Sequence, residues 1–193
     1  IAKSGQSTCS TKPARAIAIA GAMFGATEVD ALDIDPAAVE ASLQNASANG
    51  VTIHCVPAQH FSQRTLWDGN TRLWATWAVL GRERRFYFSG DTGYFTGFKE
   101  IGKRLGAFDI AALAIGAYEP PEIMKSVHLT PEEAVQAFVD LNARTLLGIH
   151  WGTFDLAEEP LDEPPGRMLA EARRHGIASE HAWILKVGET RRW

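Results

Sequence analysis

The fold is decided by residues 86–93, which read Phe-Tyr-Phe-Ser-Gly-Asp-Thr-Gly. The first half is an apolar run typical of a buried strand, and the second half is turn-forming, with Asp91 directly behind the strand. The same arrangement recurs twice, because His60 lies just after one predicted strand and His150 directly follows another. In open α/β sheets, ligands bind at the carboxyl ends of strands. We therefore expect His60, Asp91 and His150 to converge on one edge of a sheet.

Two imidazoles and one carboxylate form a nitrogen and oxygen ligand set that suits zinc or a similar divalent ion. Each residue alone has a plainer explanation. Taken alone, either histidine is more often a hydrogen-bonded core residue, and Asp91 fits a turn residue that satisfies its own backbone. The metal hypothesis depends on all three residues having the same position relative to a strand.

Outward from this stretch, the sequence predicts alternating strands and helices, which indicate an α/β fold. Strands are expected over residues 51–57, 73–80, 85–89, 110–115, 145–149 and 182–187, with a hairpin turn at 81–83. Helices are expected over residues 95–105, 131–141 and 165–176. The second of these helices has the clearest start, with Thr130 as its cap, proline in its first turn and glutamates behind it.

Composition and charge exclude several classes of protein. The chain has 193 residues, of which 46% are hydrophobic and 22% charged, and its formal net charge is −4. No apolar run is long enough to span a membrane, and no basic stripe suggests a nucleic-acid partner. Cys9 and Cys55 lack zinc-knuckle spacing, which leaves one disulfide or two thiols as alternatives. We recognise no targeting signal and expect a cytoplasmic protein.

The first 50 residues differ in composition from the rest. They contain no tryptophan or histidine and one aromatic residue, Phe24, whereas all six tryptophans and all six histidines follow. A helix is expected over residues 13–25, a strand over 28–34 and a helix over 36–49. We therefore divide the chain into segments 1–50 and 51–193, folded together as one domain.

An ordered series of short motifs extends over more than half of the chain. They are VPAQHFSQR (56–64), LWATW (73–77), YFSGDTGY (87–94), IGAYEP (115–120), VHLTPEEA (127–134) and GIHWGTF (148–154). Residues 56–165 thereby resemble the C-terminal half of the metallo-β-lactamase-fold hydrolases related to N-acylphosphatidylethanolamine phospholipase D. The resemblance implies a dinuclear metal centre, with His60 on one metal, His150 on the other and Asp91 bridging them. It also puts His128 beside the substrate, the alternative being a residue that only flanks a helix.

That family takes most of its metal ligands from a His-x-His-x-Asp-His segment, which this chain lacks. Instead, AIAGAMFGATEVDALDIDPAAV (18–39) and NASANGV (45–51) resemble the cofactor-binding region of a ribosomal protein L11 methyltransferase. A glycine-rich loop is missing before this region, which disfavours a nucleotide-binding or S-adenosylmethionine-binding module. The expected fold is therefore a chimera. It combines a partial metallo-β-lactamase-like layered sheet with a strand–helix unit of a Rossmann-like methyltransferase.

Four further residues are candidates for the site. In the methyltransferase resemblance, Asp33 matches the acidic residue that holds the ribose. Asp33 and Asp35 also lie where the hydrolases keep their histidine-rich segment, and their carboxylates are candidate replacement ligands for zinc, manganese or iron. The alternative is that Asp35 only caps a helix. Trp151 is a candidate for lining an apolar substrate pocket, and Arg64 for holding an anion, although a solvated arginine is the default.

The family resemblance favours a metal-dependent hydrolase of phosphoesters, in which a metal-bound hydroxide attacks phosphorus. His128 would orient the small-molecule substrate or protonate the leaving oxygen. The alternative is a folded chimeric protein with residual metal binding and no efficient catalysis. Because the chain retains mainly one sheet of a two-sheet sandwich, we also expect a homodimer that buries the uncovered face.

Overall fold

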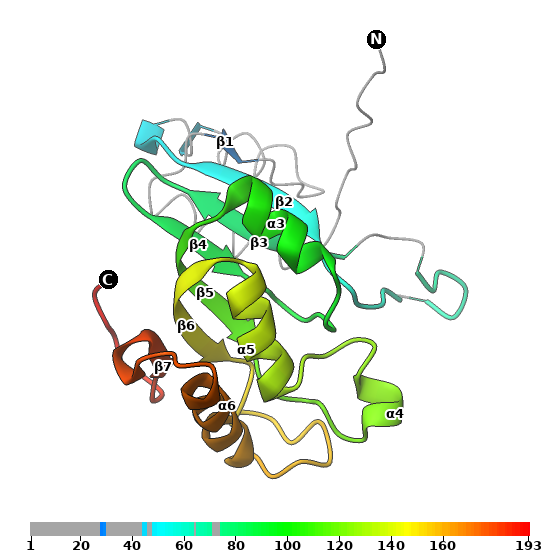
Figure 1. Cartoon of the computed structure of the whole chain (residues 1–193). Helices are drawn as coiled ribbons and strands as arrows, with labels where there is room; N and C mark the ends of the chain where they lie inside the picture. Colours follow the sequence, from blue (N-terminus) through cyan, green and yellow to red (C-terminus); the bar gives the residue numbers. More distant parts are fainter. Residues whose placement is uncertain (1–27, 30–43, 46–47, 64, 71–73) are drawn as a thin grey trace.

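A computed structural model describes residues 28–29, 44–45, 48–63, 65–70 and 74–193. Its strands form one seven-stranded sheet in which the spatial order follows the chain, from β1 to β7 (Figure 1). The strands are β1 (Glu28–Val29), β2 (Thr52–Pro57), β3 (Ala75–Leu80), β4 (Arg85–Phe88), β5 (Phe108–Ala114), β6 (Ala143–Ile149) and β7 (Ala182–Ile184). The helices are α3 (Gly97–Leu105), α4 (Pro121–Met124), α5 (Pro131–Asp140) and α6 (Glu163–Arg174), followed by a short 3₁₀ helix at Ser179–His181.

The strand directions determine which loops meet. β3 is antiparallel to both of its neighbours, β2 and β4. β4, β5, β6 and β7 are parallel to one another. β2, β4, β5 and β6 therefore point the same way, and their carboxyl ends lie along one edge of the sheet. The sequence predicted this convergence, and it is confirmed.

The predicted elements of residues 51–193 are present with small changes in their ends. The hairpin between β3 and β4 is closed by the Gly81 amide, which donates to the Arg84 carbonyl at 2.8 Å. α5 begins with the expected capping box, in which Thr130 and Glu133 each bond the other's backbone amide. α6 begins two residues before its predicted start, at Glu163. The pattern analysis missed α4 and the 3₁₀ helix, since both are too short to show periodicity.

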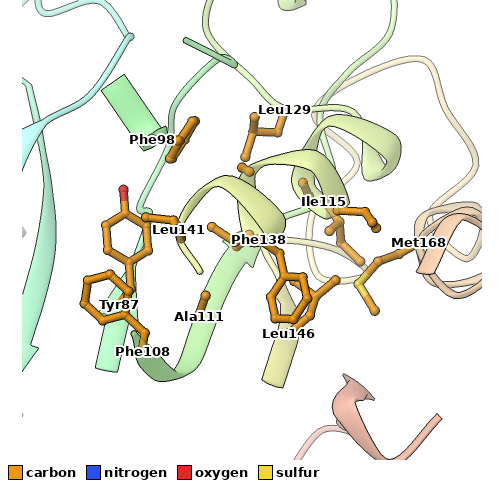
Figure 2. Close-up of a cluster of buried hydrophobic side chains, with 14 of the residues drawn as sticks. Tyr87, Phe98, Phe108, Ala111, Ile115, Leu129, Phe138, Leu141, Leu146 and Met168 are labelled. Carbon is orange, nitrogen blue, oxygen red and sulfur yellow. The ribbon is translucent and has the colours of Figure 1, made fainter. Parts of the chain in front are cut away.

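The main core lies between the sheet and three helices. α3, α5 and α6 lie along the same face of the sheet (Figure 1). Strand residues such as Tyr87 and Leu146 pack there against helix residues such as Phe138 and Met168 (Figure 2). Burying each large apolar side chain contributes about 1.5–3 kcal/mol. This packing makes the sheet a rigid base for the loops at its carboxyl edge.

The described part of the first 50 residues joins the same sheet. β1 pairs in parallel with β2, with Glu28 opposite Thr52 and Val29 opposite Ile53. Residues 44–45 and 48–49 are helical, as expected for the end of the helix predicted over 36–49. The helix predicted over 13–25 and most of the strand predicted over 28–34 lie outside the described residues. No helix in the described part of the chain is long and apolar enough to cross a membrane.

Candidate metal centre

Four polar side chains from four loops meet at the carboxyl edge of the sheet. His60 follows β2, Asp91 follows β4, His128 lies between α4 and α5, and His150 follows β6. The rings of His60 and His128 meet edge to face, with their centroids 5.2 Å apart. The rings of His128 and His150 stack at 5.4 Å, and His150 Nε2 lies 3.4 Å from Asp91 Oδ1. The three histidines predicted from the sequence and the family resemblance therefore form a row that ends at Asp91.

The backbone turns sharply next to Asp91 and at His150, the two closest residues of the site. Gly90 has φ +54°, which brings Asp91 out of the strand direction. His150 itself has φ +61°, a left-handed conformation that is uncommon for a residue with a side chain. Such positions cost of order 1–3 kcal/mol and gather at functional sites. The local strain at His150 is consistent with a functional role for its imidazole.

The end of β5 supports this turn. The Ile115 amide donates to the Ile149 carbonyl at 3.0 Å, which continues the pairing of β5 with β6. A Cβ atom at Gly116 would lie 2.3 Å from the His150 carbonyl oxygen. Only glycine lets the two backbones approach this closely, so Gly116 is required for the position of His150.

Three ring nitrogens at the site are buried without a hydrogen-bond partner among the described residues. They are His60 Nε2, His128 Nδ1 and His150 Nδ1. His60 Nδ1 instead lies 3.0 Å from the carbonyl oxygen of Phe61, which fixes the orientation of that ring. Leaving a polar atom buried and unpaired costs about 1–3 kcal/mol. Three such atoms in one cluster indicate a binding site rather than ordinary core packing.

The closest pair has the spacing of two ligands of one ion. Zinc binds imidazole nitrogen and carboxylate oxygen at about 2.0–2.2 Å with tetrahedral angles, which separates two ligand atoms by about 3.3–3.6 Å. The 3.4 Å between His150 Nε2 and Asp91 Oδ1 lies in this range. In the described ranges, no three His, Cys, Asp or Glu side chains are grouped closely enough to hold one ion. The donor set thus fits two ligands of a metal. Asp33 and Asp35 lie outside the described residues.

The central imidazole of the row is uncharged near neutral pH. Burial, followed by the neighbouring His150 and His60, lowers the pKa of His128 to about 4, against the opposing effect of Asp91 and Glu159. An imidazole with that pKa is neutral at pH 7, so it keeps one ring N–H as a hydrogen-bond donor but lacks the second proton of a general acid. His128 is therefore suited to orienting a bound group by hydrogen bonding rather than to protonating a leaving oxygen.

A pocket of about 250 Å³ opens beside His150. It lies between the loop that follows β5 and the loop that follows β6. Its lining is mainly apolar and comprises Gly116, Ala117, His150, Trp151, Gly152, Thr153, Phe154, Asp155, Leu156, Ala157, Glu159, Leu161 and Pro164. Trp151 lines this pocket, and its role in binding substrate stays a prediction.

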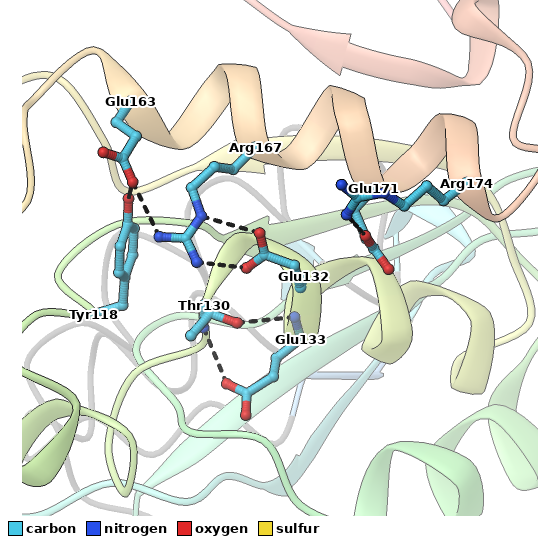
Figure 3. A network of polar contacts seen from close by, with 8 residues as sticks. All are labelled: Tyr118, Thr130, Glu132, Glu133, Glu163, Arg167, Glu171 and Arg174. Carbon is cyan, nitrogen blue, oxygen red and sulfur yellow. Dashed lines mark hydrogen bonds and ion pairs between the residues drawn. The ribbon is translucent and has the colours of Figure 1, made fainter.

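Glu159 connects the two loops that form this pocket. Its carboxylate accepts hydrogen bonds from the backbone amides of Ala117 and Glu119. Tyr118, between them, is buried and donates its hydroxyl proton to Glu163 at 2.9 Å (Figure 3). The guanidinium of Arg167 lies 4.5 Å from the Tyr118 ring centre. These contacts hold the pocket walls against α6.

The remaining candidate from the sequence, Arg64, is outside the described residues. Two further tryptophans do not line the pocket, since Trp67 is 90% exposed and Trp77 is buried in β3 opposite Phe88.

Sequence analysis missed Gln59 and Glu159. Gln59 directly precedes His60 in a motif that was recognised, so attention to the neighbours of the ligands would have found it. Glu159 lies in an acidic, proline-rich loop whose composition carries no signal for its two amide contacts.

Known protein families and structures share this fold. A family model of the β-lactamase superfamily domain matches residues 10–151. The N-acyl-phosphatidylethanolamine-hydrolyzing phospholipase D 1 of Caenorhabditis elegans is 56% identical over 107 residues, which are 55% of this chain and 30% of that protein. A metal-dependent hydrolase of Listeria monocytogenes is 32% identical over 107 residues, 55% of this chain and 40% of that protein. The chain therefore spans less than half the length of either relative.

A solved structure agrees with the family match. Igni18, a metallo hydrolase from Ignicoccus hospitalis, superposes with a TM-score of 0.56 and 24% identity, over 74% of this chain and 53% of that one. The family match begins at residue 10 and includes the stretch that resembles a methyltransferase, so it lends the methyltransferase unit no support. The Listeria relative is named as a metal-dependent hydrolase. The chain belongs to the β-lactamase superfamily, with a mixed α/β fold and a metallo-β-lactamase-like sheet.

Proposed function

We propose that the chain is a zinc-dependent phosphoester hydrolase in which Asp91 and His150 hold the metal. The observation that carries this proposal is the separation of 3.4 Å between Asp91 Oδ1 and His150 Nε2, beside three buried and unpartnered imidazole nitrogens. Both ligands follow strands of a rigid sheet, as a precise metal site requires.

Each of the four residues has a proposed role. Asp91 and His150 would hold the ion, and His60, whose Nε2 is buried and unpartnered, would hold a second ion. When bound, zinc supplies a water with a pKa near 7 and neutralises charge on the phosphoryl oxygens. His128, neutral at pH 7, orients one of those oxygens through a ring N–H.

The proposed substrate is a phosphodiester with an apolar group. The pocket beside His150 is lined by Trp151 and by further apolar side chains of the loop that follows β6. It therefore suits an apolar leaving group better than a charged one. The C. elegans relative is named for hydrolysis of a phospholipid, which is a phosphodiester of this kind. Arg64, outside the described residues, is proposed to bind the phosphate charge.

Hydrolysis of bis(4-nitrophenyl) phosphate by the purified chain tests the proposal. A chelator should stop the release of nitrophenol, and added zinc should restore it. The Asp91→Ala variant should hydrolyse the substrate at least about 100-fold more slowly. The matched control is His175→Gln, because His175 lies at the end of α6 in an ion pair with Glu171. Chelator-insensitive hydrolysis, or an Asp91→Ala variant as active as His175→Gln, would contradict the proposal.

The second candidate is a folded protein with residual metal binding and no efficient catalysis. It is favoured by one observation: within the described residues, no three potential ligands share one ion position. Zinc that binds stoichiometrically without any chelator-sensitive hydrolysis would select this candidate over the hydrolase.

A further inference from the structure

Gln59 contacts three of the loops that form the candidate metal centre. Its backbone amide donates to Thr92 Oγ1 at 2.9 Å, and its carbonyl accepts from the Gly93 amide at 2.7 Å. These two bonds join the loop after β2 to the loop after β4. Thr92 is fully buried, and its hydroxyl also donates to the Gly93 carbonyl at 2.9 Å, which closes the junction.

The Gln59 side chain reaches the third loop. Its Nε2 donates to the Ser126 carbonyl at 2.9 Å, although the two residues are 67 positions apart in the chain. Ser126 lies two residues before His128. One glutamine therefore bonds the loops that carry His60, Asp91 and His128.

Gly93 shows how closely these loops approach each other. A Cβ atom there would lie 2.8 Å from Ser126 backbone atoms and 2.9 Å from Gln59 Nε2. Real Cβ atoms essentially never come this close, so the junction has no room for a methyl group. The side-chain amide of Gln59 thus lies where the backbones of Gly93 and Ser126 approach each other closely.

We infer that Gln59 is a positioning residue that sets the relative places of His60, Asp91 and His128. The inference rests on the proposed function only where it predicts that replacing Gln59 changes metal affinity. Gln59 directly precedes His60, and Thr92 directly follows Asp91, so a shift in either bond moves a candidate ligand. Residues that orient metal ligands from behind typically change metal affinity 10–100-fold when they are replaced.

The main alternative is that Gln59 only stabilises the loops. Gln136 provides the matched control, because its Nε2 donates to Asp140 Oδ1 at 3.0 Å within α5. Gln59→Ala removes the bond to Ser126 and keeps both backbone bonds. Gln59→Glu keeps the size of the side chain and removes the donor, which provides a second variant if Gln59→Ala does not fold.

The test combines zinc affinity, the visible spectrum of the Co²⁺-loaded chain and the imidazole NMR signals of the metal-free chain. Gln59→Ala and Gln59→Glu should weaken zinc binding about 10–100-fold, alter the Co²⁺ spectrum and shift the His60 and His128 signals. Gln136→Ala, with a melting temperature similar to that of the Gln59 variants, should leave the zinc affinity, the Co²⁺ spectrum and the imidazole signals unchanged. Unchanged imidazole signals in both Gln59 variants would overturn the inference. If the unmodified chain binds no zinc, the proposed function fails, and the NMR signals alone still decide the role of Gln59.

Discussion

Single residues at the ends of β4, β5 and β6 determine the geometry of the candidate centre. His150 takes a left-handed backbone conformation, and Gly116 lets its carbonyl approach the neighbouring strand. The imidazole of His150 thereby lies within ligand distance of Asp91, at 3.4 Å. The sequence predicted the positions of His60, Asp91 and His150 at strand ends. It did not predict the role of Gln59, because Ser126 and Gln59 meet only after the whole sheet has formed.

Replacing Gly116 by alanine should destabilise the chain and weaken zinc binding. The added Cβ would lie 2.3 Å from the His150 carbonyl oxygen, so the turn that carries His150 must move. We expect a loss of about 1–3 kcal/mol in the free energy of unfolding, measured by urea denaturation. Gly166→Ala in α6 is the control, since nothing lies within 4 Å of its added Cβ. Alanine should stabilise that helix by up to about 1 kcal/mol. Equal effects of the two substitutions would contradict the steric argument.

At the scale of elements, α5 and α6 are joined by a polar network around Arg167 (Figure 3). Its guanidinium donates two bonds to the Glu132 carboxylate, at 3.0 and 2.8 Å, and a third to Glu163 at 3.0 Å. The sequence predicted both helices from their periodicity and caps. It could not predict this pairing, because Glu132 and Arg167 are 35 positions apart.

The Glu132→Gln variant should lose stability in a way that depends on pH. Burial raises the pKa of the Glu132 carboxyl, but hydrogen bonds from Arg167 and from the backbone outweigh this and lower it below the usual 4.5. A carboxyl with a lowered folded-state pKa stabilises the protein above its unfolded-state pKa, and this contribution is lost as the pH falls through the folded-state value. We expect a loss of about 1 kcal/mol at pH 7, since the pair is partly exposed to solvent.

The measurement is urea unfolding of both proteins at several pH values. The difference between wild type and Glu132→Gln should be constant from pH 7 to about 5 and should shrink in stronger acid. Glu100→Gln is a control with an exposed ion pair, Glu100 with Arg104, and should change stability less. A difference that grows as the pH falls would contradict the assigned direction.

At the scale of the whole molecule, the described helices of nine or more residues lie on one face of the sheet (Figure 1). The sequence predicted this layered α/β arrangement, because continuous apolar runs such as that of β5 are typical of a buried parallel strand. The assembly of the chain could not be derived in the same way. It depends on how the two faces are covered, which no local pattern encodes.

We predict that the chain is a twofold homodimer. The described helices of nine or more residues lie on one face of the sheet, so the opposite face is the one that a second copy would cover. Self-complementary pairing is the commonest way to bury such a face. Light scattering should give twice the 21.1 kDa of the chain at micromolar concentration. A single species of 21.1 kDa would refute the dimer.

The central claim is that Asp91 and His150 hold a divalent metal at the carboxyl edge of the sheet. Elemental analysis of the zinc-reconstituted, dialysed chain tests it most directly. The wild type and His175→Gln should each retain at least about one zinc ion per chain, whereas Asp91→Ala and His150→Ala should each retain less than about a tenth of that amount. Zinc retained equally by all four proteins, or by none of them, would contradict the account.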